Sequence, residues 1–257
     1  MAAVATVARA GGGDASPARV RFAWGSLAFG VCVFALLTAV GGRDGYHRDE
    51  LYFLEAGRHL AWGYPDQPPM VPLLARLMND LAPGSVVVLR LPSAVAAAAI
   101  VPLTAAITRL LGGERGAQLL AAGSVAVSAL LLSAGHLLST TIFDLLAWPV
   151  ILLLVVVILR GGEERLWLAI GVIAGAGLLD DDLVAFLIAA LLGGIAIAGP
   201  RRTFRSPWLW AGGLIAAMMW TPYLVWQARH GWPELTRQSR DRQWRVGHLD
   251  AAMALPA

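Results

Sequence analysis

The sequence has little of what a water-soluble protein needs at its surface. Only 14% of its 257 residues are charged, against about 25% in a typical soluble domain, and 58% are hydrophobic. That shortage of charge excludes a water-soluble globule and predicts an integral membrane protein. The formal net charge is only +3, which gives no reason to expect a nucleic-acid partner.

Cysteine is nearly absent and lysine is missing. The single cysteine, Cys32, lies in an apolar run, which excludes an intrachain disulfide and a Cys/His zinc framework. We interpret it as a small hydrophobic side chain. All 20 basic residues are arginine, and alanine, glycine and valine are abundant, which indicates a GC-rich bacterial genome. We therefore expect the plasma membrane of a bacterial cell.

What the sequence has instead is long apolar runs. They lie at residues 22–41, 86–111, 116–135, 142–159, 166–179, 183–199 and 207–227. A helix needs about 20 apolar residues to cross a bilayer, so these runs predict about seven spans, two of them short. The expected fold class is an all-α polytopic membrane protein, and the first run is too long for a signal peptide.

Arginines in the short loops predict the orientation. They gather before the first run and in the segments "TRLLGGERG", "LRGGEER" and "PRRTFR". With seven spans these segments share one side, which should be the cytoplasm, together with the N-terminus. Residues 1–20 are then a disordered cytoplasmic tail, 21–230 the transmembrane domain, and 231–257 an external tail that does not continue the hydropathy pattern.

The first external loop, residues 42–85, is unusually rich in charged and aromatic side chains. Its segment "DELYFLEAGRHLAWG" predicts an amphipathic helix with Asp49 near the N-cap and Gly63 near the end. The segment "PPMVPLLARLMNDLAPG" predicts a second helix with prolines at its start. Helices of this kind lie along the membrane interface and do not cross it.

Three external acids are candidates for chemistry. Asp49 and Glu50 are adjacent at the mouth of a span, where one carboxylate can act as a general base and the other as support or metal ligand. The alternative is that Asp49 only caps the helix and Glu50 is solvated. Asp144 lies near the external end of the fourth run, where an acid is either functional or simply hydrogen-bonded at the interface.

A run of three acids, Asp180, Asp181 and Asp182, faces the same compartment. Three carboxylates can hold a divalent cation. Because adjacent side chains point in different directions, the interpretation favoured here is a solvated turn.

The candidate anion partners on this side are Arg58, Arg76 and Arg90. Arg90 lies just inside the second run, where a guanidinium can grip a phosphate or extend to the headgroups. His136 is a candidate ligand or phosphate donor, with a plain interfacial residue as the alternative. The segment "GYPDQPP" and its surroundings carry side chains suited to a sugar, namely Tyr64, Asp66, Gln67 and Trp62.

The order of these features resembles a known family. A first span, an external Asp-Glu pair opening an interfacial helix, "GYPDQPPMVPLLARL" and "GHLLSTTIFDLLAW" resemble the bacterial glycosyltransferase family 39 group over about residues 22–235. That group includes protein O-mannosyltransferases and aminoarabinose lipid A transferases and has the GT-C fold. The resemblance implies transfer of a sugar from a polyprenyl-phosphate donor to a protein, lipid or glycan hydroxyl on the external face.

The resemblance also implies roles for the three acids. It makes Asp49 the base and places Glu50 and Asp144 beside it in the catalytic group. The leaving phosphate needs positive charge from arginine or a metal, so a divalent cation is allowed but not required, with Glu50 and Asp144 as its candidate ligands. One-step attack would invert the anomeric centre.

Two departures from the family pattern leave alternatives open. Relatives commonly have a basic or polar residue where Asp180, Asp181 and Asp182 stand, and they continue through several more spans. The alternative interpretation is a truncated, catalytically inactive relative or an accessory binding protein. A transporter ranks third, because transporter sites lie at mid-membrane on broken helices, whereas these polar groups gather at one face.

Overall fold

The computed structural model describes residues 21–234 and 236, and within them every regular element is a helix. The all-α fold class is therefore confirmed. The tail predicted at residues 1–20 lies outside the described residues, as does most of the tail predicted at 231–257.

Every predicted apolar run contains helix. The helices are α1 (Gly25–Val40), α2 (Arg48–Arg58), α3 (Met70–Leu81), α4 (Val86–Leu110), α5 (Arg115–Ala126), α6 (Ala129–His136), α7 (Thr140–Leu159), α8 (Leu166–Leu178), α9 (Leu183–Ala198), the 3₁₀ helix η1 (Arg201–Arg205) and α10 (Pro207–Arg229). The run at 116–135 is interrupted, because α5 and α6 meet at a 52° bend.

Length and composition divide these helices into two groups. In the described part of the chain, α4, α7 and α10 are long and apolar enough to cross a membrane, and α5 with α6 makes a fourth if the bent pair is one span. The helices α1, α8 and α9 are equally apolar but have 16, 13 and 16 residues. A 13-residue helix is about 20 Å long, short of the roughly 30 Å hydrocarbon core. Three or four crossings therefore meet the length criterion, against the seven expected.

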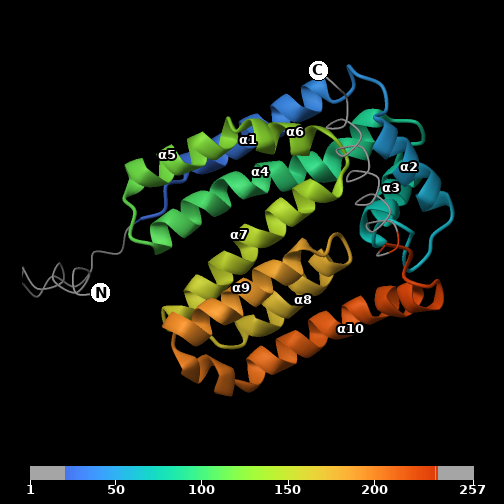
Figure 1. Ribbon diagram of the computed structural model, residues 1–257. Coiled ribbons are helices and arrows are strands. Elements are labelled where there is room, and N and C mark those ends of the chain that lie inside the picture. Colours follow the sequence, from blue (N-terminus) through green and yellow to red (C-terminus); the bar gives the residue numbers. More distant parts are fainter. Residues whose placement is uncertain (1–20, 235, 237–257) are drawn as a thin grey trace, which may run out of the picture.

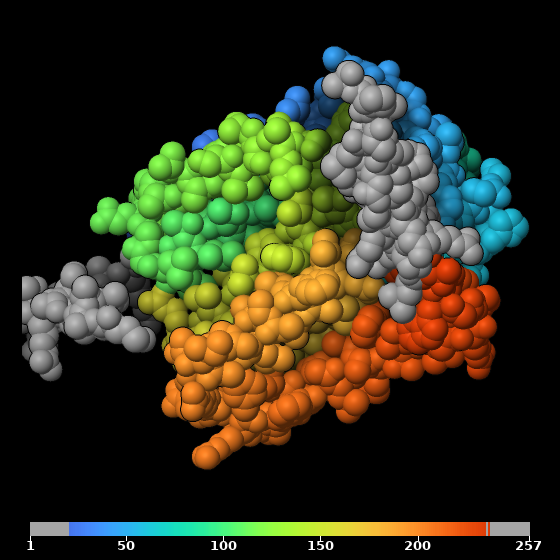
Figure 2. Space-filling model, in the orientation of Figure 1, coloured from blue at the N-terminus to red at the C-terminus, as the bar shows by residue number. Residues whose placement is uncertain are grey.

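The helices form two packed groups joined by α7 (Figure 1). The first group, α1 with α4, α5 and α6, has a core that includes Val33, Ala97 and Val101. The second, α8 with α9 and α10, packs on α7 through residues such as Ile151 and Val184. In the space-filling view α9 and α10 make one continuous face of the second group (Figure 2).

The loops separate to two ends of the molecule, as their alternation predicted. Residues 41–47, α2 and α3 lie at one end, with the α8–α9 junction and the end of α10 (Figure 1). The turn at 111–114, which Arg109 and Arg115 flank, the turn at 160–165 with its two arginines, and η1 lie at the opposite end with the start of α1. We call these the α2 end and the arginine end. That the arginine end faces the cytoplasm stays a prediction.

The two amphipathic helices of the first loop are present, with one boundary corrected. The α3 helix follows its prolines as predicted, with Pro69 as the N-cap, and exposes Leu73, Leu77 and Leu81 along one face. The α2 helix ends at Arg58, well before Gly63.

Close backbone contact joins α8 to α10. A Cβ at Gly171 would lie 2.2 Å from the carbonyl oxygen of Gly212, and one at Gly212 would lie 2.1 Å from the carbonyl oxygen of Trp167. Small residues let membrane helices approach this closely, and the resulting van der Waals contact holds them together. Glycine at 171 is therefore required by packing.

We predict that Gly171→Ala lowers the thermal stability of the purified protein, because the added methyl group forces α8 away from α10. The matched control is Gly193→Ala in α9, where a Cβ meets nothing within 4 Å. There alanine should be neutral or stabilising, by up to about 1 kcal/mol, because it favours helix over glycine. Equal unfolding temperatures for the two variants would contradict the packing role.

Candidate functional site

The first turn of α2 is fixed by its own cap. His47 is the N-cap residue, and its ring Nδ1 accepts a hydrogen bond from the Asp49 N–H at 3.3 Å. The Glu50 carboxylate reaches back to accept from the His47 N–H at 2.8 Å. This reciprocal arrangement is a capping box. The capping role considered for Asp49 therefore belongs to His47, and Asp49 occupies the second helical position.

Glu50 forms a buried, two-pronged ion pair with Arg90 of α4. Arg90 Nε donates to Glu50 Oε1 and Nη2 donates to Oε2, both at 2.8 Å. The Glu50 side chain is fully buried and Arg90 is 3% exposed. Both solvent-facing interpretations are therefore wrong: Glu50 is not solvated, and Arg90 does not extend to the headgroups, because each side chain has its partner inside the fold.

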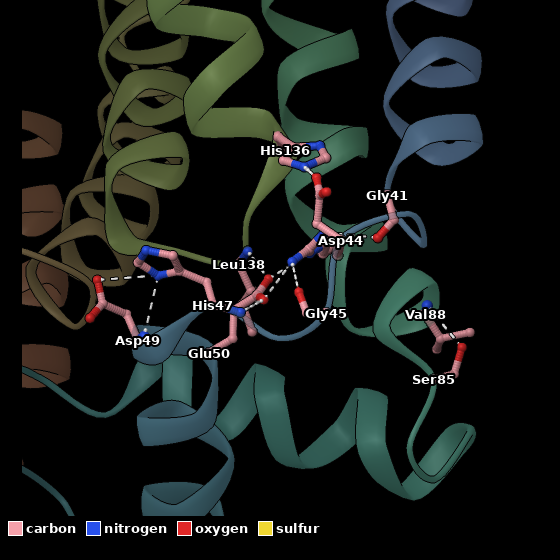
Figure 3. A network of polar contacts seen from close by, with 11 residues as sticks. Gly41, Asp44, Gly45, His47, Asp49, Glu50, Ser85, Val88, His136 and Leu138 are labelled. Carbon is pink, nitrogen blue, oxygen red and sulfur yellow. Dashed lines mark hydrogen bonds and ion pairs between the residues drawn. The ribbon is translucent and has the colours of Figure 1, made fainter.

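The same pair also forms hydrogen bonds with backbone groups of three other segments (Figure 3). Arg90 donates to the carbonyl oxygens of Gly41 at 2.8 Å and Gly45 at 3.0 Å, and Glu50 Oε1 accepts from the Leu138 N–H at 3.1 Å. Burial alone raises the pKa of Glu50, but the hydrogen bonds from Arg90, His47 and Leu138 outweigh it and bring the pKa below its usual value.

Asp49 differs sharply from its neighbour. Its side chain is 52% exposed, and its ion-pair partners among the described residues are near in sequence, with Oδ1 at 3.2 Å from Arg48 Nε and Oδ2 at 3.7 Å from His47 Nδ1. A carboxylate in this position is open to a substrate, whereas Glu50 is not. The adjacent acids thus have separate roles: one is built into the fold and the other is presented at its surface.

Asp144 lies in the second turn of α7, close behind the segment that Glu50 holds at Leu138. It is 8% exposed, and its Oδ1 accepts from the Trp148 indole N–H at 3.2 Å. Asp144 is therefore hydrogen-bonded within α7, its second carboxylate oxygen forms no hydrogen bond to a described residue, and a functional role for it stays a prediction. Asp144 is also close enough to Asp180 to raise the pKa of that residue.

The three acids at the α8–α9 junction are not a solvated turn. Asp180 is 1% exposed, and neither of its carboxylate oxygens meets a hydrogen-bond donor in the described part of the chain. Burial, then the charges of Asp181 and Asp144, raise the pKa of Asp180 well above its usual value. Burial, then the charges of Glu234 and Asp181, raise that of Asp182 to about 6. Tertiary packing of the turn has overridden its polar composition.

The loop after α2 turns back on itself around Tyr64. The Tyr64 hydroxyl donates to the Ala56 carbonyl at 2.9 Å and accepts from the Ala61 N–H, and burial raises the pKa of Tyr64. Gln67 accepts from the Tyr64 N–H at 3.0 Å through its backbone oxygen. Its side-chain Nε2 is buried with no acceptor among the described residues.

The remaining predicted binding residues lie nearer the surface. Arg58 pairs with Glu55 at 3.0 Å on the exposed side of α2, and Asp66 accepts from the Tyr52 hydroxyl at 2.5 Å. His136 Nε2 lies 3.5 Å from Asp44 Oδ2, next to the loop that Arg90 holds. The structure therefore joins Glu50 with Arg90, and keeps Arg58 and Asp66 on the outer side of α2.

The fit to a metal ion differs between the two predicted ligands. Both Glu50 oxygens already accept two hydrogen bonds each, so a cation there would displace the contacts that hold the fold. Asp144 retains an available oxygen. Among residues 21–234 and 236, no three His, Cys, Asp or Glu side chains form a group that could hold a metal ion.

Sequence reasoning missed several members of this region. Gln227 of α10 donates to the Tyr64 carbonyl at 3.4 Å and to the Tyr223 hydroxyl at 2.9 Å, which itself donates to Glu234. These contacts fasten α10 to the first loop. A buried glutamine inside an apolar run was the available signal for them.

We predict that Glu50→Gln destabilises the protein by about 3–5 kcal/mol, because it leaves the Arg90 guanidinium buried without its counter-charge. Unfolding in SDS-containing micelles measures this. The matched control is Glu55→Gln, which breaks an exposed pair worth about 0–1 kcal/mol. The double variant Glu50→Leu/Arg90→Met should recover part of the loss. Equal stability of the Glu50→Gln and Glu55→Gln variants would refute the role of the pair.

The raised pKa values of Asp180 and Asp182, at the α8–α9 junction, lead us to predict that the stability of the protein depends on pH. An acid whose pKa is raised by folding stabilises the protein below its unfolded pKa of about 4 and loses that contribution as the pH rises through the folded value. The unfolding temperature should therefore fall between pH 5 and pH 7.5, and Asp180→Asn/Asp182→Asn should flatten that fall. The control is Asp80→Asn, which removes an exposed acid of α3. An unchanged slope in the double variant would count against this origin.

Comparison with known proteins gives one result. Residues 66–226 match the family model described as dolichyl-phosphate-mannose-protein mannosyltransferase, an interval that contains Arg90 and Asp144 but begins after Asp49 and Glu50. No curated protein matches the chain, and no solved structure does. The match runs from before α3 to near the end of α10, which is more than half of the sequence. The chain therefore belongs to the dolichyl-phosphate-mannose-protein mannosyltransferase family, a family of membrane glycosyltransferases.

Proposed function

We propose that the chain moves a sugar from a polyprenyl-phosphate donor to an acceptor hydroxyl at the α2 end of the molecule, with Asp49 as the general base. The observation that carries this proposal is the fixed first turn of α2. Hydrogen bonds from Arg90 and from the His47 N–H hold Glu50 in place, so the exposed carboxylate of the adjacent residue, Asp49, has a defined position. Family membership supports sugar transfer in general terms.

The chemistry follows from the positions of the acids. The acceptor oxygen attacks the anomeric carbon while its proton passes to Asp49, and the bond from that carbon to the phosphate oxygen breaks with its electron pair leaving on the phosphate. Attack opposite the phosphate inverts the anomeric centre. Asp144, buried at the membrane face with one available oxygen, is the second acid that would orient the donor. We assign Glu50 a positioning role.

The leaving phosphate needs positive charge, and Arg90 is not its source. Arg90 is buried and already donates four hydrogen bonds. Arg48 and Arg58 are exposed on α2, and an exposed ion pair such as Arg58 with Glu55 is weak enough to be exchanged for a phosphate. The donor that we propose for a sugar hydroxyl is the Gln67 side chain, whose Nε2 has no acceptor in the part of the chain that the structure describes.

A second candidate is a catalytically inactive relative that binds a ligand without turnover. One observation favours it. Within residues 21–234, no arginine or histidine forms an ion pair with Asp144 or with the acids at 180–182. A phosphate near that junction would therefore meet these carboxylates, and among the described residues no cation is paired with them.

The test is transfer by the purified chain in proteoliposomes, with polyprenyl-phosphate mannose as the first donor because the family description names that sugar. We expect Asp49→Asn to lower the rate at least about 100-fold, since general-base catalysis contributes roughly 10²–10⁴. The control Asp80→Asn should keep the wild-type rate. An Asp49→Asn variant as fast as wild type rules out the base, and no transfer by wild type with any donor favours the second candidate.

A further inference from the structure

A long apolar cavity lies inside the second helix group. It has a volume of about 440 Å³ and is lined by α7, α8, α9, η1 and α10. Along α8 its lining runs from Trp167 to Leu178, which is about 16 Å at 1.5 Å per residue. The cavity is therefore long and narrow, and it lies along the helices.

The size of the cavity decides what kind of occupant fits. An α-helix about 10 Å wide and 16 Å long occupies roughly 1,200 Å³, more than twice the volume of the cavity. A single hydrocarbon chain is narrow enough. Because the lining is almost wholly apolar and the helices face lipid, an acyl chain from the bilayer matches both the shape and the chemistry.

The charges at one end of the cavity indicate the headgroup. Phe204 of η1 lines the cavity, and exposed arginines flank it in the chain. The helix η1 lies at the arginine end of the molecule (Figure 1). The charged residues of η1 and the neighbouring α7–α8 turn are Arg160, Glu163, Glu164, Arg165, Arg201, Arg202 and Arg205. Arginines outnumber acids, and basic clusters at the ends of membrane helices attract anionic lipid headgroups.

One unpaired donor lies at the same end. Trp167, at the start of α8, lines the cavity, and its indole N–H is buried with no acceptor in the described part of the chain. An ester oxygen near a lipid headgroup would supply that acceptor. Trp220 lines the far end of the cavity and has a similarly unpaired N–H, which a lipid at this position does not explain.

We propose that this cavity holds one acyl chain of an anionic glycerophospholipid whose phosphate binds Arg202 and Arg205. The site is distinct from the proposed sugar-transfer site, because the residues that line the cavity do not include Asp49, Glu50 or Asp144. It depends only on the chain being a membrane protein. The bound lipid fills the space between α9 and α10 and so stabilises the second helix group.

The experiment uses the full chain purified in mild detergent. Native mass spectrometry measures the lipid retained after addition of phosphatidylglycerol or phosphatidylcholine with identical acyl chains, and the unfolding temperature is measured in parallel. We expect about tenfold more phosphatidylglycerol than phosphatidylcholine to be retained, and a higher unfolding temperature with phosphatidylglycerol. The reason is that each arginine raises the affinity of the site for an anionic headgroup. Arg202→Gln/Arg205→Gln should bring the ratio near one, whereas Arg21→Gln/Arg115→Gln, which removes two charges at the same end, should preserve it.

A cavity-filling variant tests the acyl chain separately. Gly213 lines the cavity and a Cβ there meets nothing within 4 Å, so Gly213→Leu should fold and should reduce retention of both lipids. Gly194→Leu is the control, since that glycine is equally open but lies outside the lining. If Gly213→Leu does not fold, Ala189→Phe fills the same space from the exposed side of α9.

Three results would overturn the proposal. They are equal retention of the two lipids by wild type, equal retention by the Gly213→Leu and Gly194→Leu variants, and displacement of phosphatidylglycerol by an equal amount of polyprenyl phosphate. The last would assign the cavity to the lipid carrier of the proposed donor.

Discussion

The buried pair of Glu50 and Arg90 is the contact on which the arrangement of the α2 end depends. It joins α2 to α4 directly, and through Gly41, Gly45 and Leu138 it also holds the end of α1, the loop before α2 and the entry to α7. Removing two charges from water is costly, and only a full set of hydrogen bonds offsets that cost. Here both Glu50 oxygens and all three guanidinium nitrogens have partners, which is why the pair can be buried.

The helical pattern was readable from the sequence because it rests on local chemistry. Apolar runs predicted the membrane helices, and prolines marked the start of α3. The end of α2 was not readable in the same way. The helix ends at Arg58 because the Tyr64 hydroxyl donates a hydrogen bond to the Ala56 carbonyl and accepts one from the Ala61 N–H. These two contacts exist only once the loop has folded back. Gly63 was a plausible end by residue type, yet the stop is set by a side chain.

The burial and the hydrogen-bond partners of each acid could not be predicted from residue type. Glu50 and Arg90 are 40 positions apart, so nothing local shows that they meet. Asp180 is buried because its turn packs against the first loop, where the Met70 N–H donates to the Leu179 carbonyl at 2.9 Å. The available signals were polar residues inside apolar runs. Gln118 and Gln227 are both buried and hydrogen-bonded, and each fastens a loop to a helix.

The α2 end thus contains two kinds of acid with opposite energetic consequences. Glu50 is buried with every hydrogen bond satisfied, so it stabilises a single arrangement of four helices. Asp180 is buried with no donor among residues 21–234 and 236, and an unpaired buried carboxylate destabilises the fold unless it is protonated or meets a ligand. Strain of that kind persists where surrounding structure enforces it, and it concentrates at functional sites. The pair with Arg90 fixes the loop segments on which Asp49 is presented, and the hydrogen bond from the Met70 N–H to the Leu179 carbonyl holds the turn that contains Asp180. Fixed backbone at these two places lets Asp49 stay exposed beside Glu50 while Asp180 stays buried.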